Sequence, residues 1–398
     1  MLFRSVATTE SAARLSVTTR AMASSAGAPD KGAIAKILDR EKTFLTKDVK
    51  LGLDLDRIFG WKVKGVINEH VANAAWNDTT AAATIAAPAA GSRVCEYSGD
   101  FRPFAGVVAA NSATWVRVRL VRMDTYADIL PSLGGGGTQA GSGIYVSNFS
   151  TANMTLTLSV ISDVAGSDLA TDVVTAGFAI AVMLADAPVT LAAGADAGLP
   201  FGSVVSYNLQ PRGVFSNLCD PIHFTADRTT ATGKPGLQSS VLTQAVTGLH
   251  ARAAFTAERI QAVLDQILNK CGDGAEMPDT VVMNPLQRSK FTAVLVANTQ
   301  YQAKGGEGKT DIGPAFKDVA FLGYTPKISH NWPRGCVAFL KKSAWMQPEF
   351  KKPHFIDLDG SWLRMVPGQA VAEATYQTFD NFVCAEPRGQ AILTGLLV

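Results

Sequence analysis

Apolar and polar residues alternate along two stretches in the first half of the chain. Residues 115–122 (WVRVRLVR) place apolar side chains at every second position, and residues 154–161 (MTLTLSVI) alternate in the same way with Thr and Ser. A period of two sends successive side chains to opposite faces of a strand. Both stretches are therefore predicted to be strands with one buried and one solvated face, within a β-rich section over residues 93–165.

A helical period appears elsewhere in the chain. Between residues 256 and 271, apolar residues recur at i, i+3, i+4, i+7 and i+8, and Gly272 follows where a helix would stop. Two further helices are predicted, over residues 31–46 and from about residue 285 to 297, by the same criterion.

Two other segments complete the expected fold class. Residues 171–194 form a nearly continuous apolar run without a period, which is compatible with a buried helix or with buried strands. Residues 318–398 alternate short β-type runs with turns. The whole pattern predicts an α+β protein.

The charges are nearly balanced but unevenly placed. The 398 residues contain 36 Lys and Arg against 34 Asp and Glu, a net charge of +2. This balance argues against a protein that wraps nucleic acid by neutralising its phosphates. Residues 123–211 contain seven Asp and no basic residue, and no Lys occurs between Lys64 and Lys234.

Motifs for catalysis or metal binding are weak. Residues 303–310 (AKGGEGKT) approach a phosphate-binding loop, but no buried strand precedes them, so a surface loop is the better interpretation. Cys219 and His223 have no evident orienting acid for a nucleophile–base pair. The five cysteines lack zinc-site spacing, and Asp357-Leu-Asp-Gly360 is typical of a turn. We expect no catalytic residue, cofactor or metal.

Two features concern location. The first thirty residues contain three Arg, many Ser, Thr and Ala, and one Glu, a composition shared by mitochondrial transit peptides and by mobile N-terminal arms. The longest apolar run, Val173–Ala185, is too short to span a bilayer, which needs about 20 residues. We expect no membrane association.

An ordered series of short motifs occupies the C-terminal half. Its members are Asp227-Arg-Thr-Thr230, Pro278-Asp-Thr-Val-Val-Met-Asn-Pro285, Phe321-Leu-Gly-Tyr324, Pro333-Arg-Gly335, Asp359-Gly-Ser-Trp362 and the ending from Asn381 to Gly395. This series resembles the major capsid protein of tailed double-stranded DNA bacteriophages. The resemblance covers residues 205–398, about half of the chain, and residues 100–200 match nothing in that family.

The resemblance implies a Hong-Kong-97-like capsid fold of α+β class. It places an N-terminal arm and connector at residues 1–92 and an extended β loop or insertion at 93–165. A peripheral domain with a helix would occupy 166–275, and the axial domain with returning peripheral strands would occupy 276–398.

The same resemblance implies a non-enzymatic virion protein, assembled in the host cytoplasm. Copies of the chain would associate as pentamers and hexamers in an icosahedral shell. The shell would enclose double-stranded DNA without sequence-specific binding. A portal is another partner that the resemblance implies, and a separate scaffolding protein is expected because no acidic helical scaffolding segment precedes the matched half.

Two expectations concern how such a shell is held together. Some members of the family join subunits through a Lys in the extended loop, and residues 65–233 contain no Lys. We therefore predict a shell without those crosslinks. Arg117, Arg119 and Arg122 are candidates for contact with carboxylates of an adjacent subunit. The alternative is that they line an ordinary solvated strand face.

Two other classes of protein stay open at this point. A nanocompartment shell that encloses cargo shares the capsid fold. An organelle-targeted β-rich binding protein or enzyme would instead be a small soluble species. The size of the purified protein separates this last class from shell proteins.

Overall fold

The computed structural model divides the chain into two compact units built from interleaved segments. One unit contains residues 1–61, 206–214 and 346–383, and the other contains 62–205, 215–345 and 384–398. The structure describes residues 9–18, 42–43, 46–47, 50–70, 92–129, 143–161, 180–185, 189–190, 200–201, 211–223, 226–229, 238–242, 254–271, 277–298, 326–357, 364–365 and 371–396. The four-part division into arm, extended loop, peripheral and axial domains stays a prediction.

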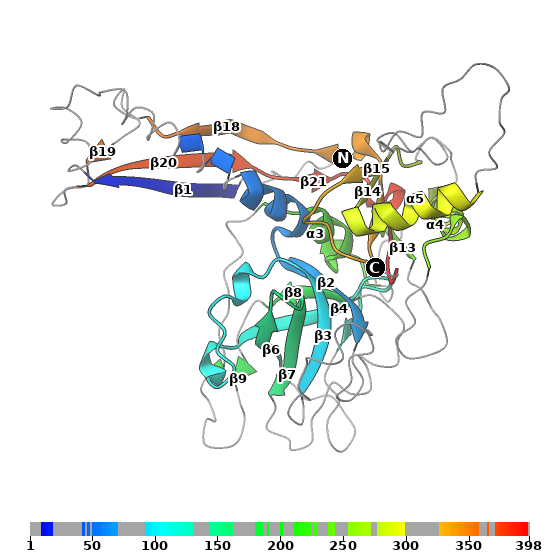
Figure 1. The fold of residues 1–398 in the computed structure, drawn as a ribbon, viewed down its shortest axis with the longest axis horizontal. Coiled ribbons are helices and arrows are strands. Elements are labelled where there is room, and N and C mark those ends of the chain that lie inside the picture. The colour runs from blue at the N-terminus through cyan, green and yellow to red at the C-terminus, as the bar shows by residue number, and fades with distance from the viewer. Residues whose placement is uncertain are drawn as a thin grey trace. The chain divides into compact units, whose positions relative to one another are not determined.

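The first unit contains a long antiparallel sheet (Figure 1). Its order is β1 (Thr9–Thr18), β20 (Val371–Asp380) and β18 (Glu349–Phe355), and β19 (Arg364–Met365) also pairs with β20. The register of β1 runs without a break from Thr9 opposite Asp380 to Thr18 opposite Val371. The N-terminal segment thus contributes a full strand, which the sequence composition did not indicate. Residues 50–59 of this unit are helical.

The second unit contains a closed antiparallel sheet. Six strands form it: β2 (Val63–His70), β3 (Ser92–Gly99), β4 (Val116–Arg122), β6 (Gly143–Ser150), β7 (Thr155–Ile161) and β8 (Ile180–Leu184). Their order is β4-β6-β7-β3-β2-β8, and β8 pairs with β4 to close the ring. The short β5 (Asp128–Ile129) adds to β4. We call this element the closed sheet.

Side-chain alternation explains the closed sheet. Val116, Val118 and Leu120 are buried, while Arg117 and Arg119 between them are half-buried. The two predicted strands are therefore confirmed as β4 and β7. The ambiguous apolar segment supplies β8, in which residues 181–184 are all buried. A strand that is buried on both faces has no polar alternation to display, which is why its type was not evident.

The second unit also contains a five-stranded sheet, with the helices α4 (Ala257–Cys271) and α5 (Pro285–Asn298), as Figure 1 shows. Its order is β13 (Ser240–Leu242), β22 (Ala391–Leu393), β16 (Val337–Leu340), β14 (Thr280–Met283) and β15 (Pro326–Ile328). Both helices are close to their predicted bounds. One apolar core joins Ile260, Val263 and Ile267 of α4 to the buried residues of β14, β16 and β22.

Shorter elements complete the described chain. They are η1 (Arg102–Phe104), η2 (Ser112–Thr114), β9 (Val189–Thr190), β10 (Pro200–Phe201), α3 (Val214–Cys219), β11 (Ile222–His223), β12 (Ala226–Asp227), η5 (Lys342–Ala344), β17 (Trp345–Met346), β21 (Val383–Cys384) and η6 (Pro387–Gly389). The combination of helices and mainly antiparallel sheets agrees with the predicted mixture of α and β structure.

Some predictions fall outside the described residues. These are most of the helix expected at 31–46, the whole phosphate-loop-like segment 303–310, and two members of the motif series, at 321–324 and 359–362. Among the helices that the structure describes, none is long and apolar enough to cross a bilayer.

Candidate functional site

The three arginines singled out in the sequence lie together on β4, and Arg119 and Arg122 form ion pairs with carboxylates of the same chain. Arg119 Nη2 lies 2.8 Å from both carboxylate oxygens of Asp128. Arg122 donates from Nε and Nη2 to Asp124, at 3.0 and 2.7 Å. The carboxylates expected from a neighbouring subunit are thus available in this chain. A contact of Arg117, Arg119 and Arg122 with another subunit stays a prediction.

A buried polar cluster in the second unit centres on Arg228, which the sequence did not single out as a site. Arg228 follows β12, and its side chain is fully buried. Its Nη2 donates to the carbonyl oxygen of Asn217 at 2.6 Å, and its guanidinium lies 5.7 Å from the centre of the Tyr126 ring. Its backbone amide donates to Pro221, and its carbonyl oxygen accepts from Gln238. Arg228 therefore links several segments of the chain.

Tyr126 reaches this cluster from the turn that joins β4 and β5. Its hydroxyl lies 2.9 Å from Ser239 Oγ and accepts a hydrogen bond from the Ser239 amide at 3.0 Å. Ser239 Oγ in turn donates to the carbonyl oxygen of Leu218 at 3.0 Å, so the tyrosine hydroxyl donates to Ser239 Oγ. The ring is 1% exposed, and burial raises the pKa of its hydroxyl. The cluster thus ties the closed sheet to α3 and β13.

Cys219 and His223 lie beside the same cluster, but their chemistry does not suit catalysis. Cys219 is fully buried, and burial raises the pKa of its thiol, partly offset by the positive charge of Arg228. A nucleophilic cysteine needs the opposite shift, because the thiolate is the reactive form. His223 Nε2 lies 3.1 Å from the carbonyl oxygen of Cys384. In the part of the chain that the structure describes, no group of His, Cys, Asp or Glu could hold a metal ion.

We expect alkylation to distinguish Cys271 from the other cysteines. Cys95, Cys219, Cys336 and Cys384 are buried, whereas Cys271 is partly exposed at the end of α4. Burial raises the pKa of Cys384 to about 12, so at pH 8 its thiol stays protonated and unreactive. Iodoacetamide at pH 8 should therefore label Cys271 first, as measured by peptide mass spectrometry. Unfolding in guanidinium should make all five reactive; equal rates in the folded protein would contradict the burial pattern.

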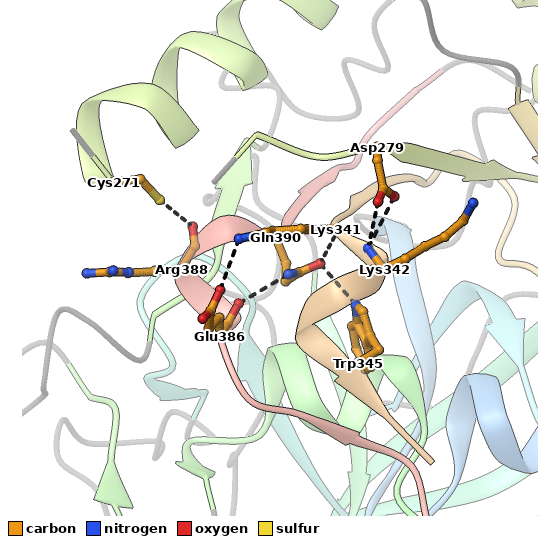
Figure 2. A network of polar contacts seen from close by, with 8 residues as sticks. All are labelled: Cys271, Asp279, Lys341, Lys342, Trp345, Glu386, Arg388 and Gln390. Carbon is orange, nitrogen blue, oxygen red and sulfur yellow. Dashed lines mark hydrogen bonds and ion pairs between the residues drawn. The ribbon is translucent and has the colours of Figure 1, made fainter. Parts of the chain in front are cut away.

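A second polar network holds the C-terminal segment against the five-stranded sheet (Figure 2). Its centre is Gln390, which is fully buried. Gln390 Oε1 accepts from the Lys341 amide at 2.9 Å and from the Trp345 indole at 3.0 Å. Gln390 Nε2 donates to the carbonyl oxygen of Glu386 at 3.1 Å. One amide side chain therefore bonds the residues on either side of η5, Lys341 and Trp345, and the residue before η6, Glu386.

Three outer contacts extend this network (Figure 2). Asp279 accepts from the Lys342 amide with both carboxylate oxygens, at 3.1 and 3.2 Å, as η5 begins. Lys341 Nζ lies 3.3 Å from Glu386 Oε2 near the surface. The Cys271 thiol donates to the carbonyl oxygen of Arg388 at 3.6 Å. The end of α4, the start of β14 and the residues after β21 are thus joined by polar contacts.

Neither polar cluster was identified from the sequence as a site, although both contain residues of the motif series. Arg228 belongs to Asp227-Arg-Thr-Thr230, and Gln390 lies in the ending between Asn381 and Gly395. Asp279 lies in the motif that ends at Pro285. The sequence offered one signal for these clusters, namely a polar residue inside a recognisable motif. The spacing of residues did not show that such a residue is buried. The side chains of Arg228, Gln390 and Asp279 form hydrogen bonds with backbone groups of other segments.

Comparisons with known proteins found partial likenesses. No family model matches the chain, and no curated protein matches it. Among solved structures, the capsid asymmetric unit of cyanophage A-1(L) is 13% identical with a TM-score of 0.33, over 48% of this chain and 61% of that one. The holo-SrpI encapsulin complex from Synechococcus elongatus PCC 7942 is 12% identical with a TM-score of 0.28, over 46% and 56%.

A structure of Mycobacterium phage Che8 is 14% identical with a TM-score of 0.26, over 39% of this chain and 53% of that one. The chain therefore spans about half to three fifths of the length of the structures it matches. Identities and TM-scores this low establish neither family nor function.

Proposed function

We propose that the chain is the major capsid protein of a tailed double-stranded DNA bacteriophage, with a Hong-Kong-97-like fold. The observation that carries the proposal is the position of the described members of the motif series in the fold. The motif ending at Pro285 forms β14 and the start of α5, and Pro333-Arg-Gly335 leads into β16. The motif after Asn381 includes η6 and β22. Segments that are far apart in the sequence thus meet in one sheet.

Self-association into pentamers and hexamers is part of this proposal. Exposed apolar side chains support it: Leu286 at the start of α5 is 42% exposed, and Ile328 on the edge strand β15 is 38% exposed. Apolar groups at the surface of a subunit are suited to contact with a neighbour. Scaffolding protein, portal and enclosed DNA are the partners that the function requires, in a virion assembled in host cytoplasm.

The test is the size and content of the purified assembly. Size-exclusion chromatography and negative-stain imaging should show capsomers or icosahedral particles, and nuclease-resistant double-stranded DNA should copurify with filled ones. A stable monomer or dimer of the 42.0 kDa chain would contradict a shell function. Particles that hold protein cargo in place of DNA would favour a nanocompartment of the same fold.

Boiling the particles in detergent with reductant tests how the shell is joined. Because residues 65–233 contain no Lys, a single band near 42 kDa is expected. A ladder of surviving multimers would contradict the absence of crosslinks through the extended loop.

A further inference from the structure

The turn between β4 and β5 contains an unusual backbone conformation. Tyr126 has a φ of 60°, in the left-handed region that aromatic residues rarely occupy. Two backbone hydrogen bonds close the turn, from the Arg122 amide to the Ala127 carbonyl at 2.9 Å and from the Tyr126 amide to the Arg122 carbonyl at 3.0 Å. Such conformations persist only where surrounding contacts impose them, and they cluster at functional and switching segments.

The contacts that impose this conformation come from a distant part of the sequence. The Tyr126 hydroxyl forms two hydrogen bonds with Ser239, and Ser239 is bonded to Leu218 of α3. The ring itself is buried. These contacts offset the unfavourable φ, so the turn keeps its shape as long as Tyr126 occupies this position.

Arg228 adds a second unfavourable feature at the same place. Its guanidinium is fully buried, yet it makes one hydrogen bond, and Nε and Nη1 have no partner among the residues that the structure describes. Removing a cation from water while leaving donors unsatisfied is costly. Burial also lowers the pKa of the Arg228 side chain, because removal from water disfavours its charged form.

We propose that Tyr126 is a releasable latch between the closed sheet and the α3–β13 segment. On release the side chain leaves Ser239 and Arg228, the turn relaxes to a negative φ, and the unsatisfied Arg228 donors gain water. Both sheets stay folded. The backbone strain and the buried donors are features of the closed latch only, so their relief partly offsets the loss of ring burial, of the Arg228 contact with the ring and of two hydrogen bonds.

The released state would let the closed sheet change its position relative to the five-stranded sheet once two further hydrogen bonds also break, from the Val63 amide to Ser216 Oγ at 3.3 Å and from the Arg334 amide to Ser98 Oγ at 3.2 Å. This consequence rests on the proposed function, because subunits of a shell occupy positions with different neighbours. Packing against a second copy of the chain would favour the position of the closed sheet that buries more surface in that contact. A ligand shifts a two-state equilibrium in the same way, toward the state that it binds better. The latch itself does not depend on that function.

Hydrogen exchange of the full chain tests the latch without requiring particles. Peptides covering residues 122–129 and 238–242 should exchange through an opening that low guanidinium concentrations do not accelerate. Peptides covering β7 and β16 should exchange at least about 100-fold more slowly, through global unfolding. Equal protection of all four peptides, lost together as guanidinium rises, would overturn the proposal whether or not the protein forms shells.

Two variants separate a latch from a permanent anchor. Tyr126→Phe removes both hydroxyl contacts and should speed exchange of the 238–242 peptide at least about tenfold, with β7 and β16 unchanged. Arg228→Met removes the unsatisfied buried donors and should slow exchange of the 122–129 peptide, because it favours the closed latch. A permanent anchor would give faster exchange in every peptide for both variants. Tyr145→Phe, on the buried Tyr145 of β6, is the matched control and should not act selectively on residues 238–242.

Discussion

Replacement of Gln390 by Ala is expected to destabilise the unit that contains the five-stranded sheet by about 3–5 kcal/mol. The variant leaves the Lys341 amide and the Trp345 indole without their common acceptor, and each unsatisfied buried donor costs about 1–3 kcal/mol. It also removes the bond to the Glu386 carbonyl and leaves a cavity at a fully buried position. Urea unfolding followed by tryptophan fluorescence measures the loss.

Two further variants control this result. Lys341→Met removes the near-surface ion pair with Glu386 but keeps the Lys341 backbone amide, so it should cost less than about 1 kcal/mol. Trp345→Phe removes the indole donor, and the double variant Gln390→Ala with Trp345→Phe should then cost less than the two single losses combined. A Gln390→Ala loss below about 1 kcal/mol, or additive losses, would mean that the network of Figure 2 does not hold the C-terminal segment.

An added methyl group at Gly99 or Gly65 should destabilise the closed sheet strongly. These glycines face each other across β2 and β3. A Cβ atom at Gly65 would lie 2.5 Å from Cε2 of Tyr97, and a Cβ atom at Gly99 would lie 2.3 Å from the backbone oxygen of Lys64. Overpacking of this kind costs about 1–3 kcal/mol where a side chain can adjust. We expect Gly65→Ala in that range and Gly99→Ala above it, because backbone atoms must move.

The reason for the glycine pair is the side chain of Tyr97. This residue is fully buried, and its hydroxyl donates to the Lys64 carbonyl at 2.7 Å. Thermal unfolding of the purified variants provides the comparison. Gly106→Ala is the matched control, since no atom lies within 4 Å of its added Cβ, and it should change stability by less than about 0.5 kcal/mol. Tyr97→Leu should partly rescue Gly65→Ala, whereas equal effects at Gly65 and Gly106 would contradict the packing.

The periodicity of apolar residues was sufficient to predict those strands and helices that have one buried and one solvated face. The alternation around Arg117 and Arg119 identified β4, and the 3.6-residue pattern identified α4 within one residue at its start. The closure of the sheet was not predictable in this way. It depends on β8, whose uninterrupted apolar run follows from burial on both faces and therefore carries no period.

The polar clusters were harder to predict from the sequence than the strands were. An arginine is usually exposed, and the burial of Arg228 depends on contacts with Asn217 and with Tyr126, which is about a hundred residues away in the sequence. The positive φ of Tyr126 has no signal in its residue type, in contrast to glycine or asparagine. The pairing of Arg119 with Asp128 was likewise unforeseen, because it requires the turn after β4 to bring β5 back alongside.

The first and last strands of the closed sheet are neighbours, and this bears on how the gene could have evolved. Val63 at the start of β2 lies opposite Met183 of β8, and the Leu184 amide donates to the Lys62 carbonyl at 2.9 Å. The chain thus enters and leaves the sheet at adjacent points, the geometry at which an inserted domain disturbs its host least. A single insertion of coding sequence between two adjacent positions of a host domain would therefore be enough to introduce the whole sheet.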